Sequence, residues 1–168
     1  MKFIESPYKR NKAIAYAQKW ALSRNPSYYN FDGIGGDCTN FISQCLYAGG
    51  GIMNHRINTG WYYYSVNSRA PSWTSVDALY RFITSNKTTG PYGYEASVEE
   101  CSPGDFIQLA TVEDYFHHSV MIVEKKDVAN FDKILVSCHT DDFRSRPLGT
   151  YDIKQIRFIK IEGIRKQG

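Results

Sequence analysis

The sequence has 168 residues, a formal net charge of +3 and 42% hydrophobic residues. A chain of this length can bury a core that needs no disulfide or metal, so a single domain over 1–168 is expected. Because its Lys and Arg residues are scattered rather than clustered, a nucleic-acid partner is not expected. No stretch has the length of a membrane span, and the N-terminus lacks the apolar region of a signal peptide.

The first predicted helix runs from about Asn11 to Ser23 and ends at Asn25-Pro26. The second begins at the segment Gly35-Gly36-Asp37-Cys38, where Asp37 is expected to cap the helix. It ends at Gly49-Gly50-Gly51, since glycine readily adopts the left-handed conformation that closes a helix.

A long loop, residues 52–72, is expected next, with the aromatic run Trp61 to Tyr64 inside it. A third helix follows from about Ser75 to Ser85. The second half has runs rich in Ile, Val, Leu and Phe that predict four strands: Asp105 to Ala110, Ser119 to Glu124, Ile134 to Cys138 and Ile153 to Ile161. Helices followed by strands predict an α+β fold with a largely antiparallel sheet.

The four cysteines, Cys38, Cys45, Cys101 and Cys138, have neither metal-type spacing nor the density of a disulfide scaffold, so free and mostly buried thiols are expected. Cys38 falls in the first turn of the second helix. The free N–H groups there favour a thiolate, which is the nucleophilic form. The alternative is that Cys38 only packs, because Cys38, Phe41, Ile42 and Cys45 have the spacing of a buried helical face.

A cysteine nucleophile needs a base, normally a histidine, and a third group to orient that histidine. His118 enters the strand Ser119 to Glu124 and is the predicted base, whereas His55 is expected to be solvated. If the strands on either side of Val128-Ala129 form a hairpin, His118 stands opposite His139, which is then the orienting group. A register change of two residues would favour Asp141 or Ser137, and a change of one would move the side chain to the other face. A zinc site is disfavoured by the adjacent pairs His117-His118 and Cys138-His139, and no cofactor or metal is expected.

The segment Gly35 to Gly50, with its string Gly-Gly-Asp-Cys-Thr-Asn-Phe, resembles the bacterial putative amidase domain family, which is related to papain-like cell-wall hydrolases of the NlpC and CHAP types. The similarity covers nearly the whole chain. It continues through these segments: Gly60-Trp61-Tyr62, Ser72-Trp73, Pro103-Gly104-Asp105, His118 to Val123 and His139-Thr140-Asp141.

The resemblance implies a papain-like core in which Cys38, on a helix, packs against a sheet that carries His118 and its polar partner, and it implies hydrolysis of an amide bond. The hairpin count above makes His139 that partner, and the reaction would proceed through a thioester. The resemblance also implies a peptidoglycan or peptide substrate, cleaved as an amidase or an endopeptidase, and a function in the cell envelope or outside the cell. A wall- or peptide-binding module of the same fold that does no chemistry is the alternative, because a fold does not fix an activity. A papain-like acyltransferase would differ only in the acceptor.

Overall fold

The computed structural model describes residues 1–112 and 114–168. Its helices and strands, in chain order, are β1 (Phe3–Ser6), α1 (Arg10–Trp20), α2 (Cys38–Gly50), β2 (Tyr63–Ser65), β3 (Ser68–Arg69), α3 (Pro71–Thr74), α4 (Val76–Ser85), β4 (Gly90–Ala96), β5 (Phe106–Ala110), β6 (His118–Lys125), the 3-10 turn η1 (Phe131–Lys133), β7 (Ile134–Cys138), β8 (Phe143–Pro147), the 3-10 turn η2 (Leu148–Thr150) and β9 (Gln155–Gln167).

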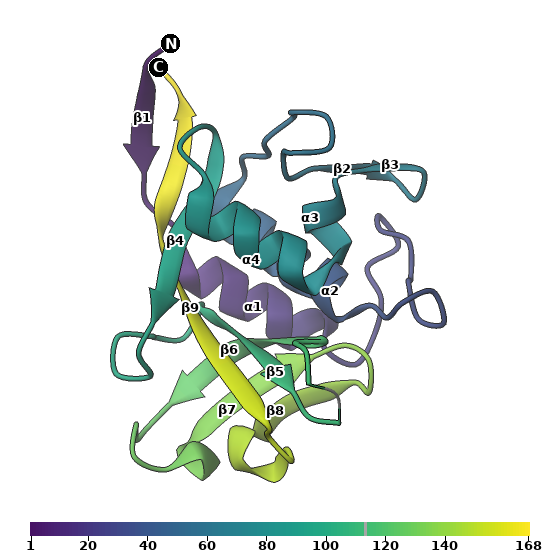
Figure 1. Cartoon of the computed structure of the whole chain (residues 1–168), viewed down its shortest axis with the longest axis vertical. Helices are drawn as coiled ribbons and strands as arrows, with labels where there is room; N and C mark the ends of the chain where they lie inside the picture. The colour runs from purple at the N-terminus through teal and green to yellow at the C-terminus, as the bar shows by residue number, and fades with distance from the viewer. Residues whose placement is uncertain (113) are drawn as a thin grey trace.

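One sheet of seven strands dominates the described chain, in the order β1-β9-β5-β6-β7-β8, with β4 also paired to β9. Each of these neighbouring strands is antiparallel to the next. The long strand β9 crosses the whole molecule, and the N- and C-termini lie side by side at its far end (Figure 1). The predicted α+β class with a largely antiparallel sheet is therefore confirmed.

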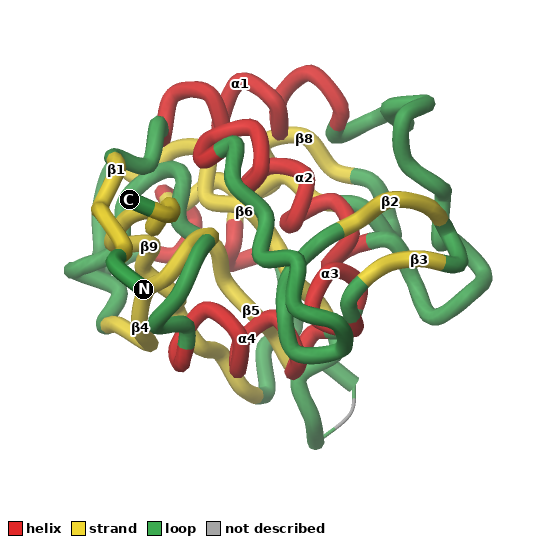
Figure 2. Tube along the Cα trace, turned by 90° about the horizontal axis from the view of Figure 1, so that it is seen from above, coloured by secondary structure: helices red, strands yellow, loops and turns green. Residues whose placement is uncertain are grey.

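Helices α1, α2 and α4 lie together beside the sheet, and α2 sits in the middle of this layer (Figures 1 and 2). Their buried side chains meet the inner face of the sheet in one apolar cluster, which includes Phe41, Leu46, Trp73, Phe106 and Ile159. Ten of the thirteen residues of α2 are buried, and its apolar side chains Phe41, Ile42, Cys45 and Leu46 belong to this cluster. This packing fixes where the N-terminus of α2, and hence Cys38, lies.

A second apolar cluster fills the opposite face of β5, β6, β7 and β9, with Ile107, Val120, Val136 and Phe158 among its members. It also includes Leu148 of η2, and Phe131 of η1 packs against it. Because side chains alternate between the two faces of a strand, this cluster and the helical cluster use alternate positions of the same strands. Both faces of the central sheet are therefore covered.

The predicted second helix is confirmed, with Gly51 closing it in the left-handed conformation at φ 70°. The first helix is shorter than predicted, and the expected loop 52–72 contains the strands β2 and β3 and the short helix α3. In Figure 2 this β2–β3 pair extends beside α3. The prediction also missed β1, β4 and β8. β4 and β8 contain Gly, Pro or charged residues, and β1 has only four residues, so none of the three shows a strand periodicity of its own. Each is defined by its pairing with a partner strand.

The predicted hairpin register between β6 and β7 is wrong by one residue near the site. Met121 pairs with Ser137 and Ile122 with Val136, and the register shifts between Ile122 and Glu124 because of an irregularity in β6. Continued toward the start of β6, the Met121–Ser137 register sets Thr140 opposite His118. His139 therefore belongs to the other face of the sheet, since a change of one residue reverses the face.

No helix among the described residues combines the length and apolar character that a membrane crossing requires.

Candidate functional site

Cys38 is the first residue of α2, and the turn before it explains the two glycines. Gly35 and Gly36 have φ of 82° and 95°, a conformation that other residues rarely adopt. A Cβ atom on Gly36 would lie 3.3 Å from the Thr140 hydroxyl, which accepts a hydrogen bond of 2.8 Å from the backbone N–H of Asp37. The turn that presents Cys38 is thus tied to the end of β7.

The Cys38 thiol is buried against the start of β6. Its sulfur lies 3.9 Å from the carbonyl oxygen of His117, to which it donates, and 3.8 Å from the Thr39 hydroxyl. Burial raises the pKa of the Cys38 thiol above its ordinary value, although hydrogen bonds from Ser119 and Thr39 oppose the rise. The expected lowering of this pKa is therefore absent in this conformation, where the helix N-terminus does not outweigh desolvation.

We expect iodoacetamide to modify Cys38 before the other three cysteines, but at a pH above 9 rather than below 8. Burial raises the pKa of all four thiols, to about 12 for Cys101 and about 11 for Cys138, and by a large margin for Cys45. Peptide mass mapping of a labelling series over pH measures the order. Rapid modification of Cys38 at neutral pH would contradict a neutral resting thiol.

His118 is the first residue of β6, and its ring lies 5.8 Å from that of Tyr151, measured between centroids. The pKa of His118 is lowered to about 4, mainly by burial and also by the neighbouring His117 and Arg146, whereas Asp141 opposes this shift. The imidazole is therefore neutral at physiological pH and can accept a proton. Within the described residues its ring nitrogens have no hydrogen-bond partner. The ring of His117, by contrast, accepts a hydrogen bond of 3.1 Å from the Thr111 N–H.

His139 is held on the helical side of the sheet rather than beside His118. Its Nδ1 lies 2.6 Å from Oδ2 of Asp37, and its Nε2 lies 2.7 Å from the carbonyl oxygen of Trp20. Both ring nitrogens of His139 are therefore engaged by oxygen atoms of other residues. Its ring also stacks on Phe41, with 4.1 Å between centroids. With both nitrogens engaged, His139 cannot orient His118 as the sequence predicted.

The sequence predicts that Asp37 caps α2, but its side chain makes no capping hydrogen bond. It joins His139 to the preceding loop instead. Its Oδ1 accepts hydrogen bonds from the Phe31 N–H at 2.8 Å and the Asn40 amide at 2.9 Å. Burial alone would raise the pKa of Asp37, but the hydrogen bond from His139, together with those from Phe31 and Asn40, holds it below its ordinary value of 3.8. The fully buried Asp37–His139 pair thus anchors the residue next to the nucleophile candidate.

Breaking this pair should destabilise the protein strongly. We expect His139→Gln or Asp37→Asn to cost about 3 kcal/mol and to lower Tm by roughly 10 °C, because each removes one partner of a fully buried pair. In His139→Gln, Arg24 Nε still lies 3.4 Å from Oδ2 of Asp37 and offsets part of the loss. Since the pKa of Asp37 is lowered by folding, its contribution is complete above about pH 4 and is lost as the pH falls further. Thermal unfolding from pH 2 to 7 measures this. Equal pH dependence in wild type and Asp37→Asn would contradict it.

A cavity of about 340 Å³ opens beside His118. It is lined by residues from the ends of β5, β6, β7 and β8 and from the segment after η2: Thr111, Val112, His117, His118, Thr140, Asp141, Phe143, Arg146, Tyr151 and Asp152. His118 lines this cavity, whereas Cys38 does not. The cavity reaches Cys38 only through His117, which lines it and whose carbonyl oxygen lies 3.9 Å from the Cys38 sulfur.

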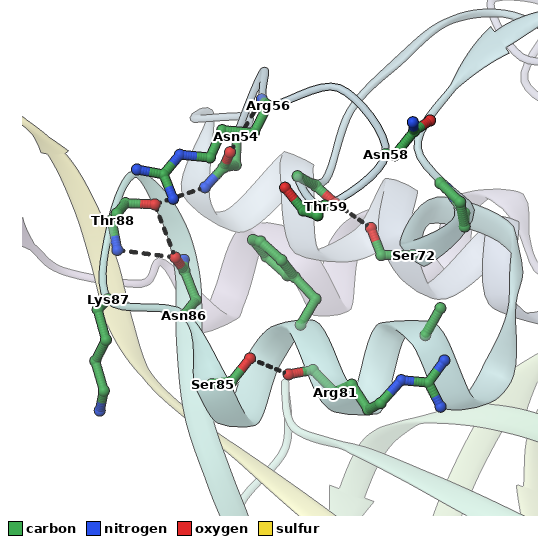
Figure 3. Close-up of a pocket in the computed structure, with 14 residues that line it drawn as sticks. Asn54, Arg56, Asn58, Thr59, Ser72, Arg81, Ser85, Asn86, Lys87 and Thr88 are labelled. Carbon is green, nitrogen blue, oxygen red and sulfur yellow. Dashed lines mark hydrogen bonds between the residues drawn. The ribbon is translucent and has the colours of Figure 1, made fainter.

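A larger cavity, of about 650 Å³, lies between α4 and the loop that carries Asn54 to Gly60 (Figure 3). Its polar wall is closed by internal hydrogen bonds such as that from Ser72 to the carbonyl oxygen of Gly60, and Arg56, Arg81 and Lys87 stand at its edges. Cys38, His118 and His139 do not line it. Size alone therefore does not identify the cavity that accompanies the predicted site.

Arg146 and Tyr151 line the small cavity but were not found by sequence reasoning. Neither residue belongs to a recognisable motif. Arg146 is positioned by the pairing of β7 with β8, which the sequence pattern does not predict, and Tyr151 follows the 3-10 turn η2. Asp141, by contrast, is the alternative third residue that the sequence offers, and it lines the cavity together with His118.

The profile of the putative amidase domain matches residues 7–161, a range that includes Cys38, His118 and His139. An uncharacterized protein, YhbB of Bacillus subtilis (strain 168), is 37% identical over 142 residues, which make up 83% of this chain. The match covers 43% of that protein, so the chain spans less than half of its relative's length. No solved structure matches significantly. Because the profile spans most of the sequence, this chain belongs to the putative amidase domain family.

Proposed function

We propose that this protein is a cysteine-dependent amide hydrolase with a papain-like catalytic arrangement. The observation that carries the proposal is the position of Cys38: a thiol in the first turn of α2, 3.9 Å from the backbone of His117 and directly beside the strand that begins with His118. Membership in the putative amidase domain family supports amide hydrolysis as the reaction.

In the proposed first step, His118 takes the proton of Cys38 as the sulfur attacks the carbonyl carbon of the substrate. Both groups start neutral, because burial raises the pKa of the thiol and lowers that of the imidazole. Proton transfer during attack, rather than a standing thiolate–imidazolium pair, follows from these pKa directions. Substrate binding must bring the two side chains together, since the thiol donates to the His117 carbonyl oxygen in the present conformation.

Formation of the S–C bond gives a tetrahedral intermediate. Its oxyanion can accept a hydrogen bond from the backbone N–H of Cys38 at the start of the helix. When the C–N bond breaks, protonated His118 gives its proton to the leaving amine and a thioester remains. His118 then takes a proton from water as the water oxygen attacks the thioester carbonyl carbon and forms a second tetrahedral intermediate. When its C–S bond breaks, His118 returns the proton to the sulfur, the carboxylic acid product leaves and the free thiol is restored.

We assign His139 a positioning role in this mechanism. Its charge-assisted bond to Asp37 holds the residue before Cys38, and its stacking on Phe41 fixes the first turn of α2. Asp141, which lines the cavity and raises the pKa of His118, is the carboxylate best placed to stabilise a protonated His118. Cys38, His118 and Asp141 are then the groups that face the substrate.

The substrate we propose is an amide bond of bacterial peptidoglycan, cleaved in the cell envelope or outside the cell. Purified muropeptides from several wall types, incubated with the protein and resolved by mass spectrometry, test this directly. New amino termini within the stem peptide indicate an endopeptidase, and release of the whole stem from the sugar indicates an amidase. No product from any wall type would reject hydrolysis of peptidoglycan.

The second candidate is a binding module of the same fold that does no chemistry. The observation in its favour is that the thiol is buried, has a raised pKa and has no hydrogen bond to His118 among the described residues. Sedimentation with intact wall material, measured for wild type and Cys38→Ala alongside the product analysis, separates the two. Binding without product in wild type would favour the module.

A further inference from the structure

Arg146 on β8 lines the cavity beside His118 with a guanidinium that is held firmly in place. Its Nε donates to the Thr150 hydroxyl at 2.7 Å, and one terminal nitrogen, Nη2, donates to the Thr150 carbonyl oxygen at 3.1 Å. The guanidinium carbon also lies 3.7 Å from the centre of the Tyr151 ring and 4.3 Å from that of Phe143. Two hydrogen bonds and two aromatic rings therefore fix the orientation of this side chain.

This fixed cation has no carboxylate partner within the described part of the chain. Arg10, Arg24, Arg157 and Arg165 each form an ion pair with an acidic residue, whereas Arg146, like the four remaining arginines, forms none among the described residues. Arg146 differs from those four because it lines the cavity beside His118. Its other terminal nitrogen, Nη1, also has no acceptor among the described residues. Since a fixed guanidinium loses little freedom on binding, its unused donors are suited to a planar anionic group of a ligand.

We propose that Arg146 binds a free carboxylate of the substrate, next to the amide bond that Cys38 and His118 process. This inference rests on the proposed function, because it places the substrate in the cavity beside His118. It makes Arg146 a specificity-determining residue, and it makes the substrate class a peptide with an unmodified carboxylate near the scissile bond.

The other charges of the cavity favour a carboxylate over a phosphate. Asp141 and Asp152 line the same cavity, so a phosphate group with two negative charges would meet two like charges and one cation. A carboxylate carries a single charge and has the flat geometry that the guanidinium edge matches with two parallel hydrogen bonds.

Carboxylate binding also acts on the base. The positive charge of Arg146 is one of the causes that keep the pKa of His118 low. A bound carboxylate offsets that charge, and His118 then becomes a stronger base in the complex than in the free protein. A substrate with the correct carboxylate is thus bound more tightly and also meets a more effective base.

The test compares muropeptides that carry free carboxylates with the same muropeptides after carbodiimide coupling to ammonia, which converts the carboxylates to amides. Wild type should prefer the free carboxylates by about 10- to 100-fold in kcat/KM, as expected for a charge-assisted hydrogen bond. Arg146→Gln should abolish the preference and Arg146→Lys should retain part of it. Arg144→Gln, on the same strand but outside the cavity, should keep the wild-type preference.

The ratio of the two rates does not depend on the fraction of folded protein, so a partly unfolded Arg146 variant still gives an answer. An unchanged ratio in Arg146→Gln would overturn the inference. The inference would also be overturned if inorganic phosphate inhibited wild type but not Arg146→Gln, while amidation of the muropeptides had no effect on the rate. Calorimetric titration of Cys38→Ala, with and without Arg146→Gln, against both muropeptide forms separates this inference from the proposed function.

If binding of the free-carboxylate form depends on Arg146 but wild type shows no turnover, hydrolysis alone is rejected. If wild type cleaves both forms at equal rates, the role of Arg146 alone is rejected.

Discussion

Replacing Cys38 or His118 by alanine should lower kcat/KM for amide hydrolysis by about 10⁴- to 10⁶-fold, and the double variant should be little worse than either single one. In the proposed mechanism the thiol and the imidazole act as a unit. Without the base the buried thiol would stay protonated, and without the thiol the base would have nothing to activate. Initial rates on the muropeptide cleaved best by wild type measure the effect.

Cys101→Ser is the matched control for these variants, because Cys101 is also a buried free thiol but packs in the cluster on the opposite face of the sheet. It should retain activity in proportion to its folded fraction. If His117→Ala abolishes turnover while His118→Ala does not, the catalytic histidine has been assigned to the wrong side of the strand. Loss of activity in Cys101→Ser comparable to that in Cys38→Ala would point to a general effect of thiol removal.

The second large effect concerns pH. The pKa of His118 is lowered to about 4, so kcat/KM should stay high down to about pH 5 and fall below pH 4 as the imidazole takes up a proton and can no longer accept one from Cys38. Asp141 raises the pKa of His118, so Asp141→Asn should move this fall in activity to a lower pH. A series of kcat/KM values from pH 3 to 8 measures both.

Circular dichroism at each pH separates titration of His118 from acid unfolding, to which the loss of the Asp37 interaction contributes below about pH 4. A fall in kcat/KM near pH 6.5, the ordinary value for histidine, would mean that His118 is not buried in the active protein. No change of the profile in Asp141→Asn would remove Asp141 from the site.

Much of the helical half could be predicted because its signals are local. The glycines at 35 and 36 and at 49 to 51 mark the two ends of α2, and the apolar spacing between them fits a buried helix. Cys38 could be placed at a helix start for the same reason. The residue pattern does not predict how deeply the Cys38 thiol is buried, because this burial depends on the packing of β6 and β7 against the start of α2. The burial raises the pKa of Cys38, whereas the sequence predicts a lowered one.

The role of His139 shows how a site prediction depends on register. The hairpin count assumed regular pairing, but β6 contains an irregularity between Ile122 and Glu124, and such a shift leaves no mark in the alternation of apolar residues. One residue of difference moved His139 from the side of His118 to the side of Asp37. Arg146 was missed for a related reason, since β8 has no apolar alternation and gains its position from β7.

The most direct test of the central claim, that Cys38 is the nucleophile, is intact-protein mass spectrometry after rapid acid quenching of a reaction with a cleavable muropeptide. A covalent acyl-enzyme should appear as a mass increase equal to the acyl portion of the substrate. Peptide mapping should place it on Cys38, and hydroxylamine should remove it, as expected for a thioester. The adduct should be absent from Cys38→Ala. Turnover by Cys38→Ala at the wild-type rate, or an acyl group mapped to any other residue, would contradict the account.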